Sequence, residues 1–146
     1  MNITTELVSE RLIGLLKECA LPVGDISSAC PTQFFGIRIG GALAAVVGLQ
    51  LYEHVGLLRS LAVLPSLRGL GLAKSLVSFA ESYASSNGID ELFLLTTTAE
   101  RFFLKLGYLP ASRATAPTVI QATSEFAELC PASSVFLSKH MGRGGQ

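Results

Sequence analysis

The sequence predicts a mixed α/β fold, α+β in character, in which an antiparallel meander of strands is followed by a βαβ crossover. Three apolar, strand-like runs joined by short turns occupy residues 34–64, and a run with helical apolar spacing follows over 69–86. A short apolar run at 91–96 completes a strand–helix–strand unit, whose two strands are expected to be parallel and adjacent. We therefore expect one mixed sheet with helices on its faces.

Length and composition indicate one ordinary globular domain over residues 1–146. Hydrophobic residues make up 49% and charged residues 15%, with a formal net charge of zero. This balance argues against a nucleic-acid partner, and no apolar run is long enough to span a membrane. Three cysteines without CxxC or Cys/His spacing favour reduced thiols in the cytoplasm and no metal site. The small number of charges favours a homodimer that covers an apolar face.

The first half of the chain is expected to contain one helix and three strands. Residues 5–19 form the amphipathic helix, and its expected buried face consists of Leu7, Leu12, Leu15, Leu16 and Cys19. Asp25 is expected to cap a short helical turn that runs through Ala29. The strands are expected at residues 34–39, 42–52 and 56–64. Gly40-Gly41 makes the first hairpin turn, and the polar Glu53-His54 pair makes the second break.

The second half is expected to alternate helices and strands. Asn87-Gly88 ends the helix of residues 69–86, because Gly readily adopts the left-handed conformation of a helix stop. Thr97 and Glu100 have the spacing of a capping box for a helix over 99–106. The remaining expectations are an extended segment from Tyr108, a partly helical run at 116–129 with Glu125 and Glu128 exposed, a strand at 134–137, and a frayed tail at 142–146.

The turn between the third strand and the long helix carries the strongest functional signal. Gly69 and Gly71 let backbone N–H groups approach an anion, and the helix start adds partial positive charge. Arg68 stands at the mouth of this turn and supplies a full charge. The glycines alone fit a tight turn without a ligand equally well. Nucleotide P-loop and dinucleotide motifs both fail, because Ala73 and Lys74 occupy positions where those motifs need Gly.

This turn and its neighbours resemble the GNAT acyltransferase superfamily. The family signature R/Q-x-x-G-x-G/A is similar to Arg68-Gly69-Leu70-Gly71-Leu72-Ala73. Flanking family segments are similar to Leu61-Ala62-Val63-x-Pro65 and to Ala99-x-x-Phe102-Phe103-x-x-x-Gly107-Tyr108. The resemblance implies a GNAT-like mixed sheet with splayed parallel central strands. It also implies acetyl-CoA-dependent acetylation of a small amine or amino-acid-like acceptor.

A narrower similarity is to the N-acetyltransferases associated with arsenic resistance. It rests on the segments at residues 58–63, 95–100 and 129–133. This similarity implies a link to resistance against arsenic or a toxic analogue. Cys130 fits that context, although a small buried thiol is its simpler role.

The GNAT resemblance implies acetyl-CoA as co-substrate and no metal. Backbone N–H groups from Arg68 to Ala73 would cradle its pyrophosphate, and the strand edge at Leu61 and Val63 would pair with the pantetheine amides. The Val63 N–H would also stabilise the oxyanion of the thioester carbonyl. Phe102 and Phe103 would wall the pantetheine, or serve as core aromatics. The full implied set is Leu61, Ala62, Val63, Arg68, Gly69, Leu70, Gly71, Leu72, Ala73, Thr96, Phe102 and Phe103.

The acid and base common in the family are replaced here. Phe103 stands where many members have a Tyr acid, and Leu57 where some have a Glu base. Positioning an amine beside a polarised thioester already supplies much of the rate, so these departures do not exclude acetyl transfer. The candidates are Tyr108, Ser60 and Thr96 for protonating sulfur, and Glu53 or His54 as base.

Arg59 and Ser60 are candidates for acceptor binding. Because side chains alternate along a strand, we expect the two to point to opposite faces, with one facing the acceptor. An arginine would suit an acceptor carboxylate. A strand-edge arginine held by a nearby acid fits the sequence equally well.

Two other functions stay open at this stage. A non-catalytic acyl-CoA-binding sensor or partner module fits the missing acid and base, and turnover with any acceptor would exclude it. A protein-lysine acetyltransferase would need an acidic groove for a basic peptide, and the sequence contains no acidic cluster.

Overall fold

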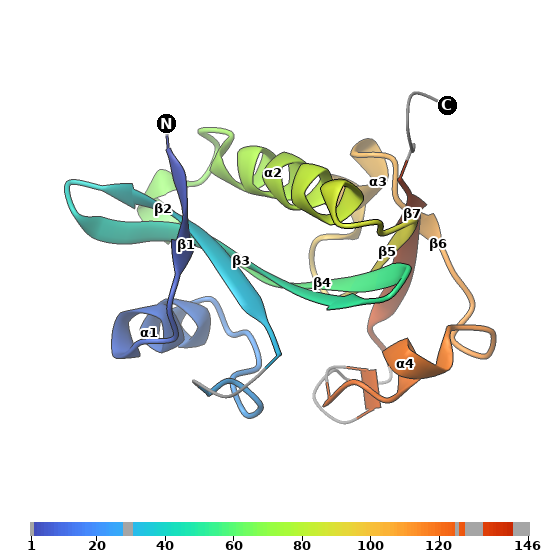
Figure 1. The fold of residues 1–146 in the computed structure, drawn as a ribbon. Coiled ribbons are helices and arrows are strands. Elements are labelled where there is room, and N and C mark those ends of the chain that lie inside the picture. Colours follow the sequence, from blue (N-terminus) through green and yellow to red (C-terminus); the bar gives the residue numbers. More distant parts are fainter. Residues whose placement is uncertain (1, 28–30, 125, 128–132, 142–146) are drawn as a thin grey trace. The chain divides into compact units, whose positions relative to one another are not determined.

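The computed structural model describes residues 2–27, 31–124, 126–127 and 133–141 (Figure 1). In chain order, its elements are β1 (Ile3–Glu6), α1 (Glu10–Glu18), β2 (Gln33–Ile39), β3 (Ala42–Tyr52), β4 (Val55–Val63), the 3₁₀ helix η1 (Pro65–Leu67), α2 (Leu72–Ser86), β5 (Glu91–Thr96), α3 (Glu100–Lys105), β6 (Leu109–Pro110), α4 (Thr118–Gln121) and β7 (Val135–His140). Among the described residues, no helix is both long enough and apolar enough to cross a bilayer.

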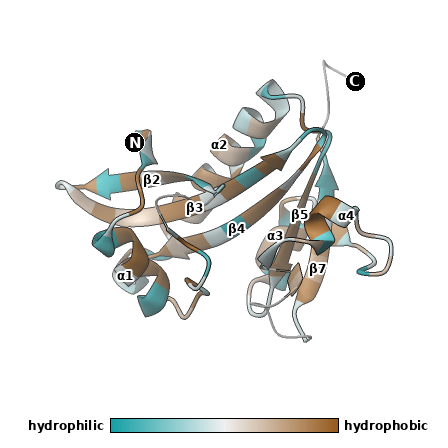
Figure 2. Cartoon of the chain, turned by 60° about the horizontal axis from the view of Figure 1, so that its bottom comes forward, coloured by the Kyte–Doolittle hydropathy of each residue, from teal (hydrophilic) through white to brown (hydrophobic). Residues whose placement is uncertain are grey.

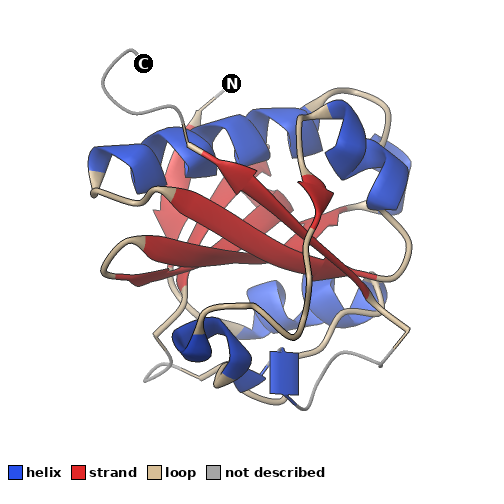
Figure 3. Cartoon of the chain, turned by 90° about the vertical axis from the view of Figure 1, so that its right-hand side faces the viewer, coloured by secondary structure: helices blue, strands red, loops and turns tan. Residues whose placement is uncertain are grey.

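The seven strands form one mixed sheet in the order β1-β2-β3-β4-β5-β7-β6. Strands β1, β2 and β3 pair antiparallel with their neighbours along the chain, and β7 pairs antiparallel with both β5 and β6. Figure 3 shows the strands in red and the helices in blue. β4 and β5 are parallel, with Val55–Leu57 in register with Glu91–Phe93, and both strands continue beyond these residues. The predicted mixed sheet, meander and βαβ crossover are therefore confirmed.

The chain falls into two compact units, each built from two chain segments. Unit 1 consists of Met1–Gln50 and Leu58–Tyr83, and unit 2 of Leu51–Leu57 and Ala84–Gln146. β3, β4 and α2 contribute residues to both units. The assignment of one domain to residues 1–146 stays a prediction.

The core of unit 1 joins α1 to the first strands. Buried leucines of α1 pack with Phe34, Val46 and Ala62. β3 is hydrophobic along most of its length, as expected for a central strand whose two faces are covered (Figure 2). A second cluster in this unit is aromatic. The ring centroid of Phe35 lies 5.0 Å from the ring centroids of Phe79 and Tyr83, which both lie on α2.

The predicted start of the first helix is wrong. Ile3–Glu6 is a strand that pairs with β2, and α1 begins only after Ser9, whose hydroxyl accepts a hydrogen bond from the Leu12 N–H at 3.2 Å. Leu7 is 84% exposed instead of buried. Two successive threonines favour extended backbone, and pairing with β2 decides the outcome over the helical spacing.

Both predicted turns around β3 are present. Gly40 and Gly41 have φ values of +60° and +81°, as a two-residue hairpin of this type requires. Residues 53 and 54 form the turn before β4. The strands themselves match the expected ranges to within a residue or two.

The long helix begins three residues later than predicted and ends where expected. Gly69 and Gly71 have positive φ values, so neither can lie within a right-handed helix, and α2 starts at Leu72. At its other end Gly88 has φ +82°, and the Ile89 N–H bonds to the Ala84 carbonyl at 3.1 Å. This is the predicted glycine stop.

Unit 2 has its own core, in which the chain around α4 packs on β5 and β7. The rings of Phe93 and Phe136 stack at 5.5 Å, and Ile120 of α4 joins the same cluster. The predicted capping box is wrong. Ala99 occupies the cap position of α3 without a side-chain bond, and the Thr96 hydroxyl accepts the Ala99 N–H at 2.9 Å.

Several expectations concern residues outside the described part of the chain. These are the helical turn through Ala29, the exposure of Glu125 and Glu128, the role of Cys130, and the tail at 142–146.

Candidate functional site

The loop between β4 and α2 keeps its outer side open. Gly69 and Gly71 have φ values of +86° and +82°, a conformation that other residues adopt only with strain. A Cβ added to either glycine would meet no atom within 4 Å. The glycines are therefore required by backbone conformation and not by crowding, and the space beside them is accessible to a ligand.

The backbone of this loop presents free hydrogen-bond donors. Within the described residues, no group accepts a hydrogen bond from the N–H groups of residues 69–73. The helix that follows is 15 residues long, and its first ladder bond runs from the Ser75 N–H to the Gly71 carbonyl at 3.0 Å. Open N–H groups at the start of a helix suit an anionic group such as a phosphate.

Arg68 places a positive charge at the mouth of the loop. Its Nε donates to the Val63 carbonyl at 3.2 Å, and its Nη2 lies 3.5 Å from the Cys19 sulfur. The Cys19 thiol is free and donates to the same carbonyl at 3.5 Å. The exposed guanidinium is thus anchored at one edge beside the end of β4.

The last residues of β4 form the strand edge that the sequence assigns to pantetheine. Ala62 and Val63 are buried and Leu61 is half-buried. The next residue, Leu64, donates its N–H to the Ala44 carbonyl of β3 at 2.9 Å, which fixes this end of the strand. The oxyanion role of the Val63 N–H stays a prediction.

Ser60 interrupts β4 with a left-handed residue. Its φ is +56°, which is uncommon for any residue other than glycine and typical of a β-bulge within a strand. The Arg59 Nε donates to the Ser60 Oγ at 3.0 Å, so the two side chains touch. The expectation that they point to opposite faces is therefore wrong, because the bulge breaks the alternation.

Arg59 is held by an acid from the loop after α1. Its side chain is 0% exposed, and its Nη1 and Nη2 donate to the two Asp25 oxygens at 2.5 and 2.8 Å. Asp25 is the counter-ion of a buried guanidinium, and its predicted role as a helix cap concerns a turn outside the described residues. Of the two interpretations of Arg59, the structure contains the ion pair, and acceptor binding stays a prediction.

The aromatic candidates cluster within unit 2. Phe102 and Phe103 meet edge-on with centroids 5.0 Å apart, and Phe103 meets Tyr108 at 5.4 Å. Tyr108 is 0% exposed, and the Lys139 ammonium lies 5.6 Å from its ring centroid. This burial gives the Tyr108 ring a packing role, and its role as an acid stays a prediction. The Thr96 hydroxyl is the acceptor for the Ala99 N–H described above.

Glu53 and His54 lie in the exposed turn before β4, at the opposite end of that strand from Leu61–Val63. Glu53 has a φ of +35°, and His54 Nδ1 lies 4.0 Å from the Asp90 carboxylate. The role of Glu53 or His54 as base stays a prediction.

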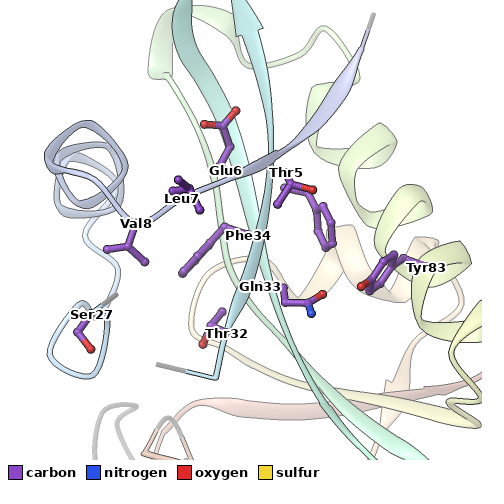
Figure 4. A pocket seen from close by; sticks show the side chains of 10 residues that line it. Thr5, Glu6, Leu7, Val8, Ser27, Thr32, Gln33, Phe34 and Tyr83 are labelled. Atoms are coloured by element: carbon purple, nitrogen blue, oxygen red, sulfur yellow. The ribbon is translucent and has the colours of Figure 1, made fainter. Parts of the chain in front are cut away.

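A pocket of about 440 Å³ in unit 1 has no counterpart in the sequence analysis (Figure 4). Its lining residues are Thr5, Glu6, Leu7, Val8, Ser27, Thr32, Gln33, Phe34, Phe35 and Tyr83. Of these, only Glu6 is charged, and Arg38 donates to both of its oxygens, at 2.7 and 3.1 Å. These hydrogen bonds hold the pKa of Glu6 below its ordinary value. This pocket carries no signal in the sequence, because residues 5–8 have helical spacing.

A model of the acetyltransferase (GNAT) family matches residues 5–108. The chain belongs to this family. The matched range includes the whole loop from β4 to α2.

Two curated relatives and a solved structure illustrate the similarity of this GNAT chain to known proteins. An amino-acid acetyltransferase from Ralstonia nicotianae is 38% identical over 82 residues, which are 55% of this chain and 18% of that protein. An uncharacterised N-acetyltransferase from Chlorobaculum tepidum is 38% identical over 76 residues, 52% of this chain and 46% of that protein. This chain therefore corresponds to less than half the length of either relative.

The solved structure is N-acetylglutamate synthase from Neisseria gonorrhoeae, in complex with coenzyme A and N-acetyl-glutamate. It has a TM-score of 0.80 at 18% sequence identity, covering 98% of this chain and 36% of that chain. At this level of identity the similarity establishes the GNAT fold and nothing more specific.

Proposed function

We propose that this chain is an acetyl-CoA-dependent N-acetyltransferase whose acceptor is a small amine or an amino-acid-like molecule. The observation that carries the proposal is the open loop from Arg68 to Ala73. It combines two positive-φ glycines, free N–H groups, a helix start and an anchored guanidinium, in a chain of the GNAT family. A CoA pyrophosphate has the charge and size that this arrangement suits.

Different residues of unit 1 would bind different parts of acetyl-CoA. The N–H groups from Gly69 to Ala73 would hold the pyrophosphate, and Arg68 would pair with one of its charges. The edge at Leu61 and Val63 would hold the pantetheine amides as an added strand would. Thr96, Phe102 and Phe103 stay predicted contacts to the same molecule.

Acetyl transfer forms a bond between the acceptor nitrogen and the acetyl carbon and breaks the carbon–sulfur bond. The amine loses a proton, and the departing thiolate gains one. Since Phe103 and Leu57 carry no ionisable group, holding the amine in place and stabilising the oxyanion at the Val63 N–H would supply most of the rate. Tyr108 and Ser60 stay proposed proton donors, and Glu53 a proposed base.

The acceptor class is suggested by the relatives. One relative at 38% identity is an amino-acid acetyltransferase, and the similar solved structure holds N-acetyl-glutamate. These relatives favour a catalytic protein over a CoA-binding sensor. Arg59 and Ser60 stay proposed partners of an acceptor carboxylate, and in the structure the Arg59 guanidinium donates to Asp25.

Three finer proposals rest on the sequence alone. They are the link to arsenic or toxic-analogue resistance, carried by the segments at 58–63, 95–100 and 129–133, a cytoplasmic location, and a homodimer. Light scattering at micromolar concentration tests the last, since a mass near 15.4 kDa would contradict a dimer.

Two measurements test the proposed function. Calorimetry is expected to show saturable 1:1 binding of CoA, and a protein that binds none contradicts the proposal. A thiol-release assay with acetyl-CoA and a panel of amino acids and amines is then expected to show turnover with at least one acceptor. Binding without turnover across the panel would favour the sensor instead.

A further inference from the structure

We propose that Asp25 is a positioning residue, which acts through Arg59 to hold the bulge at Ser60 and so aims the Leu61–Val63 edge. The proposal rests on the proposed function, because that edge is the one assigned to acetyl-CoA. Asp25 lies in the loop after α1, 34 residues before Arg59, and the sequence pattern gives it no such role.

The bulge needs an external restraint. Ser60 has a φ of +56°, where contact between Cβ and the backbone makes the conformation unfavourable for any residue with a side chain. Such a residue persists only when its surroundings fix it. The Arg59 Nε, which donates to the Ser60 Oγ at 3.0 Å, is one such restraint within the described structure.

The restraint is itself fixed by Asp25. The Arg59 side chain is 0% exposed and that of Asp25 is 19% exposed, so the pair is largely removed from water. Two parallel N–H···O bonds define the plane of the guanidinium, and this plane sets the direction of the Nε bond to Ser60. Without this acid the buried guanidinium would lose these two bonds and the orientation that they define.

The bulge changes the direction of the strand edge that follows it. A Cβ on Gly48 would lie 3.0 Å from the Phe34 ring and 3.2 Å from the Arg59 Cγ, so the three residues share one face of the sheet. Ala62 packs with Phe34 and the leucines of α1 on that same face. In a regular strand, residues 59 and 62 would point to opposite faces. The left-handed Ser60 shifts the alternation by one residue, and this shift determines which backbone groups of Leu61–Val63 face outward.

Removing Asp25 alone would take two charged hydrogen bonds from a buried guanidinium, so the informative variant removes both charges. Asp25→Asn with Arg59→Met is expected to fold, and to bind coenzyme A at least tenfold more weakly than the wild type, by calorimetry. Adding Ser60→Gly to this double variant is expected to restore the affinity to within about threefold, because glycine adopts φ +56° without a restraint. A purely structural ion pair predicts no such rescue.

A matched control comes from a second acid–arginine pair of unit 1, Glu6 and Arg38. Glu6→Gln removes the partner of Arg38 and is expected to lower the free energy of unfolding while leaving the dissociation constant of coenzyme A unchanged. If the double variant binds coenzyme A as tightly as the wild type, or the triple variant no better than the double, the positioning role is wrong.

A second readout separates this proposal from the proposed function. In ¹⁵N-resolved NMR spectra, the amide signals of Leu61–Val63 are expected to move in the double variant and to return in the triple variant, with no ligand present. A wild-type chain that binds no coenzyme A would overturn the proposed function. Amide signals that stay in place in the double variant, or fail to return in the triple variant, would overturn the positioning role.

Discussion

Replacing Gly71 with alanine separates backbone strain from ligand binding, because the chain contains a matched glycine. Gly71 and Gly88 stand at opposite ends of α2 and both have φ +82°. Neither has an atom within 4 Å of the place where a Cβ would stand. Alanine at either position therefore meets the same conformational penalty of about 1–2 kcal/mol and no clash.

The two substitutions are expected to differ only in their effect on CoA. If the loop relaxes to relieve the strain, binding must restore its conformation, and about 1–2 kcal/mol corresponds to a dissociation constant roughly 5–30 times larger. Gly71→Ala is expected to show this loss. Gly88→Ala is expected to lower the free energy of unfolding by about 1–2 kcal/mol and to bind CoA like the wild type.

Calorimetry with CoA and urea unfolding monitored by circular dichroism measure both quantities on the same samples. A Gly71→Ala variant that binds CoA as tightly as the wild type would refute the assignment of the loop as the pyrophosphate site. Equal losses of affinity in both variants would show that strain anywhere in α2 weakens binding.

Three further predictions concern single side chains. Arg68→Ala is expected to weaken CoA binding by about tenfold or more, because a charged hydrogen bond contributes about this much, and the loss should be smaller at high salt. Calorimetry at two ionic strengths measures this difference, and a loss that does not depend on salt would contradict the prediction. Hydrogen bonds from Arg38 hold the pKa of Glu6 below its ordinary value of 4.5, so the pair stabilises the fold above that pH, and this contribution is lost as the pH falls through the lower folded-state pKa. The urea midpoint of the wild type should therefore fall more steeply below pH 4.5 than that of Glu6→Gln. Parallel pH profiles of the two proteins would contradict a stabilising role for the pair. The Ser134 hydroxyl is buried without a partner among the described residues, so Ser134→Ala should stabilise the protein by about 1 kcal/mol, and a lower free energy of unfolding would contradict that.

Features set by local sequence were predicted well. The Gly40-Gly41 hairpin needs two left-handed residues in succession, and glycine signals that need directly. β3 and β5 were found from uninterrupted apolar runs, and Gly88 from the rule for helix ends. The strand–helix–strand order predicts that β4 and β5 pair in parallel.

Features set by distant contacts were missed. β1 forms because it pairs with β2 some thirty residues away, and its own four residues carry little signal. The capping box failed because the Thr96 hydroxyl, one residue earlier, takes the N–H of Ala99. The Thr97–Glu100 spacing alone does not decide where a helix begins, because tertiary placement also contributes.

The candidate site shows the same division. Its loop could be predicted, since Gly69 and Gly71 mark it in the sequence. The bulge could not, because serine gives no sign of a left-handed conformation. The sequence favours a helix cap at Asp25, since nothing local to it indicates an arginine 34 residues further on. The pocket beside β1 was hidden by the mistaken helix assignment for the same residues.

The most direct test of the account follows the loop amides themselves during a titration with CoA. In ¹⁵N-resolved NMR spectra of the full chain, the amide signals of residues 69–73 are expected to shift strongly and to saturate together, because these N–H groups are the proposed pyrophosphate ligands. The Gly88 amide, with the same backbone conformation, is expected to stay in place. A saturating titration that leaves the amides of residues 69–73 unmoved would contradict the central claim.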